Sequence, residues 1–334
     1  LVENLSKTLD IAKEKLFSPA FSEADFKRIK KAYIEGLEAE KKNAQYLAQT
    51  AMGNVLFGET PYGRFMTEKT IKKIKIKDVK SYYNNYSPNV SELVVVGNIK
   101  REELYKKLDF LRIWENKNIV LPSQFDFPKD NTTQIYLIEK EGASQSFILM
   151  GHKSDSYDVD GVYFKSQVMN KSLGGGASGR LFLNLREDKG YTYGAYSFFM
   201  GEKETGLFAI QTSVKTEVTD SALTEIFSIL EDYTNVGLTK EELISTKASY
   251  LNSEAMKYET PSQKLRFLNR ILTYDLDPSY INKQADVLNS MTLEEVNSIA
   301  SSKIKPNEMA IVIVGNKYLI KKKLENLASK TDGM

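Results

Sequence analysis

The chain has 334 residues, with 46 basic and 44 acidic side chains, a formal net charge of +2 and 41% hydrophobic residues. This balance excludes a disordered or fibrous protein, and it differs from that of nucleic-acid-binding proteins, whose basic residues cluster on one element. No apolar run approaches the ~18 residues needed to span a bilayer, and the length is typical of two domains.

The first hundred residues are mostly helical by their hydrophobic period. Leu5, Leu9 and Leu16 share one helical face, and Ser22 with Asp25 has the pattern of an N-cap before a long helix. In chain order, the sequence predicts helices over 5–16, 22–37, 46–55 and 76–83, a turn over 58–63, and a strand over 93–96.

The segment 119–131 contains prolines and loses the helical period, so we predict that it is a linker. It divides the chain into a first domain over 1–118 and a second over 132–334. The second domain is expected to begin with strands over 134–139 and 145–151, and to continue into a helix from about 160 to 172.

The stretch Ser172–Phe199, SLGGGASGRLFLNLREDKGYTYGAYSFF, concentrates glycines, a basic residue and tyrosines. A helix is predicted over 178–189, because Gly190 stands where a left-handed C-terminal cap is needed. The tyrosines after it predict a strand. A helix that ends at a glycine and continues into a strand folds back on itself, so Arg186 and Tyr193 can face one spot.

Three segments of the first half recur in the second half at nearly one spacing. SEADFKRIKKAY at 22–33 resembles TKEELISTKASY at 239–250, and Val79 aligns with Val296, both 217 positions apart. SELVVVGN at 91–98 resembles EMAIVIVGN, at an offset of 218. This spacing predicts a tandem duplication whose first copy lacks about 85 residues, if the copies are of equal length.

The expected fold is therefore α+β, with tandem duplicated domains that each form a mostly antiparallel sheet flanked by helices, the first domain being truncated. An incomplete domain leaves an open sheet edge or an apolar face. We therefore expect a partner, or association into a homo-oligomer.

Metal ligands are scarce in this sequence. The chain has no cysteine and one histidine, His152, whereas zinc sites normally combine two or more His or Cys side chains. His152 is predicted to be a solvated loop residue. We therefore expect no metal site in this chain.

Gly174, Gly176 and Gly179 spell G-x-G-x-x-G. A helix, not a strand, is predicted before them, so the pattern is a weak indication of dinucleotide binding. We interpret these glycines as a tight turn between helices, with closeness to a substrate backbone as the second interpretation.

LGGGASGRLFLNLREDKGYTYGAYS, preceded by QSFILMGH, resembles the second domain of pitrilysin/insulinase-type peptidases, zinc enzymes with the inverted motif H-x-x-E-H. FSEADFKRIKKAYIEGLEAE, LFGETPYGR and YSPNVSELVVVGN resemble the later part of their first domain. The resemblance covers essentially the whole chain.

The resemblance implies that H-x-x-E-H would lie upstream of Leu1. A third zinc ligand, a glutamate, would stand at the position of Gly36, and a supporting acid at the position of Ile29. Glu35 is adjacent, but one residue along a helix rotates a side chain by about 100°. The chain is interpreted as a family member whose own zinc site has been lost, with an alignment slip of one residue as the alternative.

The family includes two-chain assemblies in which one subunit carries zinc and the other supplies an Arg and a Tyr. The resemblance implies that Arg186 and Tyr193 are these catalytic residues. Gly174, Gly175 and Gly176 are the candidate substrate-binding residues, on the second interpretation of the glycine turn. A guanidinium and a phenol can both stabilise the oxyanion of a tetrahedral intermediate.

Both residues also have plainer interpretations. Arg186 would be an exposed residue at a helix end, favourable to the helix dipole and paired with a neighbouring acid. Tyr193 would be a core or sheet-face aromatic residue, no different from Tyr191 or Tyr196.

The function that follows is a non-catalytic subunit that is inactive alone and acts on peptides together with a zinc-bearing homologous subunit. Extended peptides would add to a sheet edge. Two alternatives stay open: a structural family member with no role in proteolysis, and a fragment of an active zinc peptidase. By resemblance only, a periplasmic or otherwise exported location is expected.

Overall fold

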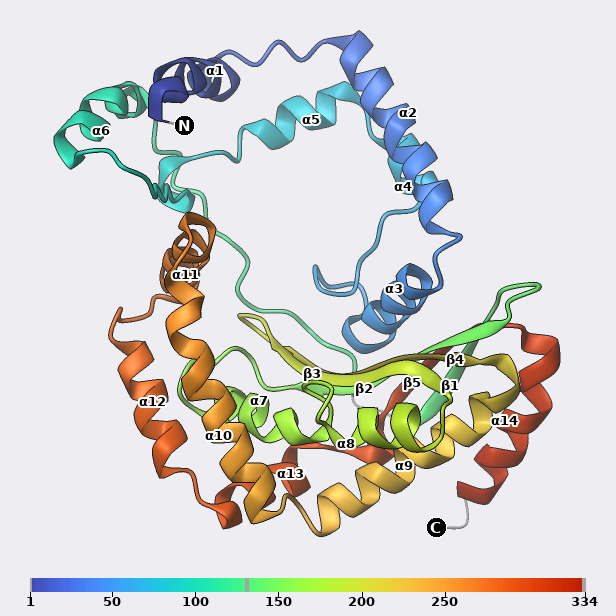
Figure 1. Cartoon of the computed structure of the whole chain (residues 1–334). Helices are drawn as coiled ribbons and strands as arrows, with labels where there is room; N and C mark the ends of the chain where they lie inside the picture. Colours follow the sequence, from blue (N-terminus) through green and yellow to red (C-terminus); the bar gives the residue numbers. More distant parts are fainter. Residues whose placement is uncertain (1, 130–131, 332–334) are drawn as a thin grey trace. The chain divides into compact units, whose positions relative to one another are not determined.

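The structure is a computed structural model that describes residues 2–129 and 132–331. The chain forms two compact units, each built from several stretches of sequence (Figure 1). Unit 1 combines the chain up to Glu38 with Met66–Ser123 and Glu254–Leu276. Unit 2 combines Ala39–Phe65, Gln124–Ser253 and the chain from Asp277 onward.

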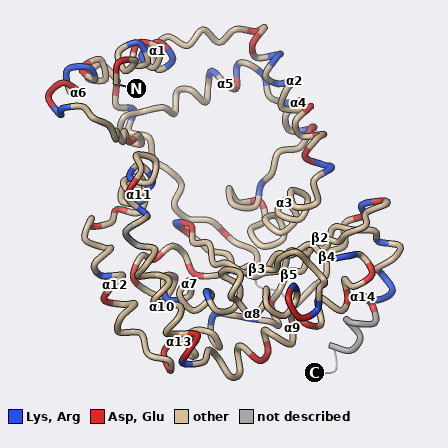
Figure 2. The backbone as a smooth tube through the Cα atoms, in the orientation of Figure 1, with Lys and Arg blue, Asp and Glu red and all other residues tan. Residues whose placement is uncertain are grey.

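Unit 1 is helical and contains no strand among its described residues. Basic and acidic residues occur together along most of its helices (Figure 2). The helices of unit 1 are α1 (Leu5–Phe17), α2 (Glu23–Glu40), α4 (Glu68–Lys73), α5 (Ile76–Tyr83), α6 (Arg101–Lys107) and α11 (Pro261–Tyr274).

Unit 2 is built on a five-stranded sheet with the order β1-β5-β2-β4-β3. β1 and β5 pair in parallel, and all other neighbours are antiparallel, so the predicted α+β class and the mostly antiparallel sheet are confirmed. The strands are β1 (Gln134–Glu139), β2 (Gln145–Ser154), β3 (Thr192–Gly201), β4 (Gly206–Lys215) and β5 (Ala310–Gly315).

The two faces of this sheet carry different layers (Figure 1). Because successive side chains of a strand point to opposite faces, Ile148 and Met150 pack against one helical layer, whereas Leu149 packs against α3 on the other face. The first layer contains α7, α9, α13 and α14. The helices of unit 2 are α3 (Ala44–Phe57), α7 (Val162–Leu173), α8 (Arg180–Phe182), α9 (Thr219–Asn235), α10 (Lys240–Glu254), α12 (Tyr280–Ser290), α13 (Leu293–Lys303) and α14 (Lys317–Thr331).

The predicted duplication is visible in individual hydrogen bonds. Lys30 Nζ on α2 donates to the carbonyl oxygen of Lys72 (2.7 Å). Lys247 Nζ on α10 donates to the carbonyl oxygen of Asn289 (2.9 Å). Both donors and both acceptors are 217 positions apart, as are the first residues of α5 and α13. The two halves therefore repeat the same helical framework.

The strand predicted over 93–96 is not formed, and the sheet expected in the first domain is absent from the described residues of unit 1. Its counterpart β5 pairs with β1 on one side and β2 on the other. A strand is stable only with neighbours that complete its hydrogen bonds, and no segment of unit 1 in the described ranges supplies one. Leu93 is 58% exposed as a result.

The predicted division into 1–118, a linker over 119–131 and 132–334 concerns the duplicated domains and stays a prediction. The compact units divide the chain differently, because α3 packs on the sheet of unit 2 although it lies in the first half of the sequence. The last two residues of the predicted linker, Asp130 and Asn131, lie outside the described residues.

His152 is not the solvated loop residue that was expected. β2 continues to Ser154, which places His152 inside the sheet with 3% of its surface exposed and its ring 5.2 Å from that of Phe208. Nε2 accepts a hydrogen bond from the backbone N–H of Lys305 (3.1 Å), and Nδ1 lies 2.7 Å from the carbonyl oxygen of Lys153. The imidazole therefore joins β2 to the segment before β5.

Candidate functional site

The glycine turn after α7 lies directly against strand β3. Gly174 and Gly175 both donate their N–H groups to the carbonyl oxygen of Asn170 (3.0 Å each), and Ser197 N–H on β3 donates to the carbonyl oxygen of Gly174 (3.0 Å). A Cβ on Gly174 would lie 2.5 Å from Ser197 Oγ. Glycine is required here for this close approach. The structural interpretation of the turn is confirmed, and substrate binding by Gly174, Gly175 and Gly176 stays a prediction.

A Gly174→Ala substitution is therefore expected to lower the free energy of unfolding by roughly 1–3 kcal/mol, because the methyl group overlaps the β3 backbone and side chain of Ser197. Urea unfolding followed by circular dichroism measures it. Gly176→Ala is the matched control: its Cβ would meet only the flexible end of Lys171 at 3.3 Å, so a change within about 0.5 kcal/mol is expected. Equal effects of the two substitutions would contradict the packing argument.

Helix α7 also occupies part of the outer edge of β3, which is an edge strand of the sheet. Asn170 Nδ2 donates to the carbonyl oxygen of Ser197 (2.8 Å). Tyr163 OH and Gln167 Nε2 each lie 3.4 Å from the carbonyl oxygen of Phe199. A peptide that adds to this edge as a strand would have to displace these contacts.

The helix predicted over 178–189 is divided into two parts. α8 begins at Arg180, and the chain then continues as a π-helical segment, Leu183–Asp188, in which Lys189 N–H donates to the carbonyl oxygen of Asn184. π-Helical turns hold one extra residue per turn and are frequent at functional sites. Gly190 has a φ of +64° and ends the segment, as predicted.

Arg186 lies on the outer side of the π-helical segment. Its guanidinium carbon is 4.8 Å from the centre of the Phe182 ring, and its Nε is 3.3 Å from the carboxylate of Glu187. Pairing with a neighbouring acid is what the plainer interpretation of Arg186 predicted. Among the described residues, no hydrogen bond joins Arg186 to Tyr193, so the structure does not link the two side chains directly.

Tyr193 projects into solvent with 86% of its surface exposed. Tyr191 instead packs partly against the core, and the Tyr196 ring lies 5.8 Å from that of Phe182. The three tyrosines are therefore not equivalent, and Tyr193 is neither a core residue nor packed on the sheet face.

A bulge in β3 accounts for this exposure. The pairing of β3 with β4 shifts register between Thr192 and Ala195. Thr192 Oγ1 accepts from Gly194 N–H (3.1 Å) and donates to the carbonyl oxygen of Ser213 (2.7 Å), while Thr212 Oγ1 donates to the carbonyl oxygen of Gly194 (3.0 Å). Bulges redirect side chains, and here two threonines satisfy the backbone around Tyr193.

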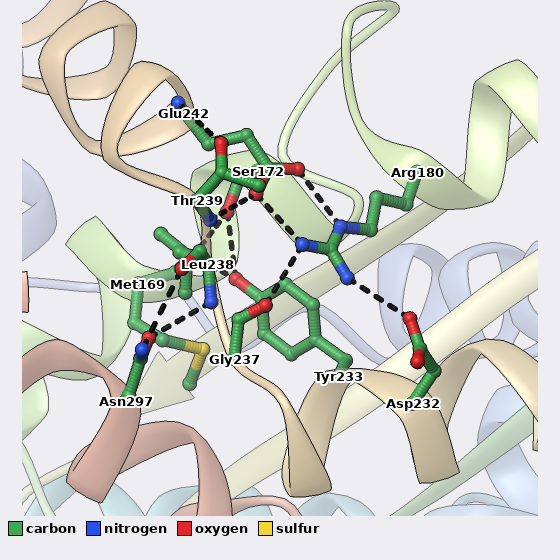
Figure 3. A network of polar contacts seen from close by, with 10 residues as sticks. All are labelled: Met169, Ser172, Arg180, Asp232, Tyr233, Gly237, Leu238, Thr239, Glu242 and Asn297. Carbon is green, nitrogen blue, oxygen red and sulfur yellow. Dashed lines mark hydrogen bonds and ion pairs between the residues drawn. The ribbon is translucent and has the colours of Figure 1, made fainter.

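Arg180, at the first position of α8, is the centre of a polar network (Figure 3). Its Nε and Nη2 donate to the two carboxylate oxygens of Glu242 (2.8 and 2.7 Å), and Nη2 also donates to the carbonyl oxygen of Gly237 (2.8 Å). Nη1 lies 3.4 Å from Asp232, and the guanidinium covers the ring of Tyr233 at 4.9 Å. This arginine therefore joins the start of α8 to α10 and to the loop before it.

Tyr233 extends the network into the core. Its hydroxyl donates to the carbonyl oxygen of Met169 on α7 (2.7 Å) and is 2.7 Å from the hydroxyl of Ser172. Burial raises the pKa of Tyr233 well above its ordinary value. The network thus holds both helices that flank the glycine turn.

Arg180 was not among the predicted site residues. One signal was available: a cation at the N-terminus of a helix opposes the helix dipole, so an arginine there indicates a partner elsewhere. The partner Glu242 lies 62 positions away and could not be found from spacing alone.

Glu242 makes the stability of this network pH-dependent. Partial burial raises the pKa of its carboxyl group, but hydrogen bonds from Arg180 and Thr239 outweigh burial and hold it below the ordinary value of 4.5. A depressed folded-state pKa stabilises the protein above the unfolded-state pKa, and this contribution is lost as the pH falls through the folded-state value. The difference in unfolding free energy between the native chain and Glu242→Gln is therefore expected to be constant from neutral pH to about pH 5 and to shrink below it. Urea titrations at pH 7, 5 and 3.5 measure this, and a constant difference would contradict it.

Neither the position predicted for the third zinc ligand nor that of its supporting acid has an acidic residue, since Gly36 and Ile29 stand there on α2. Glu35 is exposed, and its carboxylate lies 3.6 Å from the Nζ of Lys31. In the described part of the chain, no three His, Cys, Asp or Glu side chains gather where they could hold a metal ion. The same residues include no helix that is long and apolar enough to cross a bilayer.

Comparison with known families agrees with this architecture. Residues 73–250, more than half of the chain, match the family described as the Peptidase M16 inactive domain. The chain belongs to this family. The predicted family resemblance is confirmed by it.

Individual relatives and solved structures are similar to this M16 chain over most of its length. "Non-peptidase homolog YmxG" of Helicobacter pylori is 26% identical over 311 residues, which cover 91% of this chain and 71% of the relative. The crystal structure of a peptidase M16 inactive domain from Pseudomonas fluorescens has a TM-score of 0.84 at 24% identity, covering 94% and 76%. The periplasmic protease PqqL from Escherichia coli has a TM-score of 0.74 at 15% identity, covering 94% of this chain and 35% of PqqL. Both structures share the fold.

Proposed function

We propose that this chain is a non-catalytic subunit that lends Arg186 and Tyr193 to a zinc-bearing homologous subunit in a metallopeptidase that acts on peptides. The observation that carries the proposal is the presentation of Tyr193, whose phenol is 86% exposed on a bulge held by Thr192 and Thr212. These hydrogen bonds hold the backbone on both sides of Tyr193, so its phenol is already presented to solvent before a substrate arrives. Membership of the inactive M16 family supports a chain that does not carry the reaction alone.

The two side chains suit an oxyanion. A guanidinium whose present partner is a neighbouring surface carboxylate can exchange it for a developing negative charge, because exposed ion pairs are weak. The phenol would add a second donor, and the zinc of the partner subunit would activate the water. Gly175 is exposed and Gly176 partly so, whereas Gly174 is buried against β3. Substrate contact is therefore assigned to Gly175 and Gly176, with Gly174 shaping the turn.

Reconstitution tests this function. The chain would be mixed with the zinc-bearing M16 homologue of its own genome, and cleavage of quenched fluorescent peptides followed. We expect the cleavage rate of the mixture to exceed that of either chain alone. The increase in rate should saturate at a fixed ratio of the two chains. Cleavage by this chain alone with zinc would instead support a fragment of an active peptidase.

A structural role without proteolysis is the second candidate, since the H. pylori relative is named a non-peptidase homolog. It predicts stable association with a homologous partner and no change in peptide cleavage. An exported, periplasmic location is also proposed, supported by the similarity to periplasmic PqqL. Fractionation of cells that express the tagged natural protein tests it.

A further inference from the structure

We propose that an apolar groove in unit 1 is the docking site of an α-helix of the α7 type, brought by a polypeptide segment other than residues 1–334. The groove lies between α2, α4 and α5 and has a volume of about 520 Å³. Its apolar lining includes Phe21, Phe26, Ile29, Tyr33, Ile74 and Val79. This inference is independent of the function proposed for Arg186 and Tyr193.

The duplication shows what such a groove looks like when it is filled. Ile74 and Val79 are 43% and 38% exposed in unit 1. Their counterparts 217 positions later, Met291 and Val296, are 2% and 0% exposed. Val79 and Val296 lie on α5 and α13, which begin at the same offset, and Ile74 and Met291 each stand two residues before the helix. Unit 1 therefore has the framework of the filled groove without the element that fills it.

In unit 2 that element is α7. Helix α7 packs against α13, and its Phe164 ring meets the Tyr250 ring of α10 edge to face at 6.2 Å. The counterpart of Tyr250 is Tyr33, which lines the groove of unit 1 and is largely exposed. Among the described residues of unit 1, no helix takes the place of α7. An aromatic residue at the position of Phe164 is therefore expected on the occupant.

A charged residue of α5 specifies a second feature of the occupant. In unit 2, Lys165 of α7 forms an ion pair with Glu295 of α13. The counterpart of Glu295 is Asp78, which accepts a hydrogen bond from Lys75 N–H (2.8 Å) and forms no ion pair with any described residue. Asp78 is thus in place to pair with a basic residue that follows the aromatic one.

A second copy of this chain does not meet these requirements. Its own α7 is occupied, because Val168, Met169 and Leu173 are fully buried in the core of unit 2. Releasing α7 from one copy to fill another would expose that core. The occupant is therefore a different segment with an apolar helical face, an aromatic residue and an adjacent Lys or Arg.

The test uses the internal template as a probe. A fluorescent peptide with the sequence of residues 160–174 is held helical by a hydrocarbon link between the positions of Gln167 and Lys171, since isolated helices of this length are marginal in water. We expect saturable binding to the full chain by fluorescence anisotropy. Val79→Asp should weaken binding at least about tenfold, because it places a carboxylate in an apolar contact.

Two controls separate docking from misfolding. Val79→Asp should leave the melting temperature within about 1 °C of the native chain, because Val79 is exposed without the occupant. Asp78→Lys should weaken binding of the native peptide and strengthen binding of a peptide that carries glutamate at the position of Lys165. A folding defect cannot produce this reversal.

The proposal is overturned by any of three results. These are no saturable binding of the linked peptide, equal binding of a peptide with serine at the positions of Phe164 and Val168, or a dimer in analytical ultracentrifugation that Val79→Asp dissociates. The last result would assign the groove to a second copy.

Discussion

Tyr193→Phe is expected to lower the peptidase rate of the reconstituted complex by about 10²-fold, and Arg186→Ala to a similar extent, because each removes one donor from the oxyanion of the intermediate. The phenylalanine variant removes only a hydroxyl group that makes no hydrogen bond within the described chain, so the fold of β3 is unaffected. The loss should appear in kcat more than in KM, since the oxyanion forms only on the way to the transition state.

Tyr196→Phe is the matched control. It lies on the same strand, but its ring packs on Phe182 and is less exposed than that of Tyr193. We expect its complex to keep the native rate within about twofold. If Tyr193→Phe and Arg186→Ala also keep the native rate while the subunits still associate, the donor role is wrong and the structural role is favoured.

Arg180→Ala is expected to lower the free energy of unfolding by about 3 kcal/mol, because it leaves the carboxylate of Glu242 without its cationic partner, and the carbonyl oxygen of Gly237 without a donor, in a partly buried site. It also uncovers the ring of Tyr233, whose hydroxyl reaches α7. Urea unfolding at pH 7 measures the change. Arg180→Lys should recover only part of it, since a lysine cannot bind both carboxylate oxygens in the same planar geometry.

Arg186→Ala provides the contrast within the same segment. Its guanidinium is paired only with the exposed Glu187 and the face of Phe182, so the expected loss is about 0.5 kcal/mol or less. Two arginines six positions apart are thus predicted to have opposite profiles: Arg180 affects folding, and Arg186 affects the reaction. Similar stability losses for both would show that Arg180 is not the centre of the network.

Much of the local structure could be predicted from the hydrophobic period and from the residues that end helices and strands. The strand over 134–139 and the helix over 76–83 were predicted with the bounds that the structure gives them. Gly190 adopts the left-handed conformation that its position after a helix demanded. These features depend on residues that are close in sequence, so a single sequence is sufficient to predict them.

The predictions that were wrong depend on neighbours in space. The segment 93–96 has the composition of β5 but no partner strand among the described residues, so composition alone did not make it a strand. His152 was expected in solvent, although the antiparallel pairing of β2 with β4 carries the strand past it. The π-helical segment and the bulge at Thr192 were not predicted, because neither has a simple period.

The sequence by itself determined the family, the α+β class, the duplication at 217 residues and the pair Arg186 and Tyr193 as candidates, since each is written in residue order and spacing. Only the tertiary structure decided how those candidates are presented. Contacts across long sequence separations set the bulge that exposes Tyr193, the attachment of α8 through Arg180, and the open groove of unit 1. Burial and hydrogen bonding between distant segments cannot be read from spacing, and they decide which side chains remain available to a substrate or a partner.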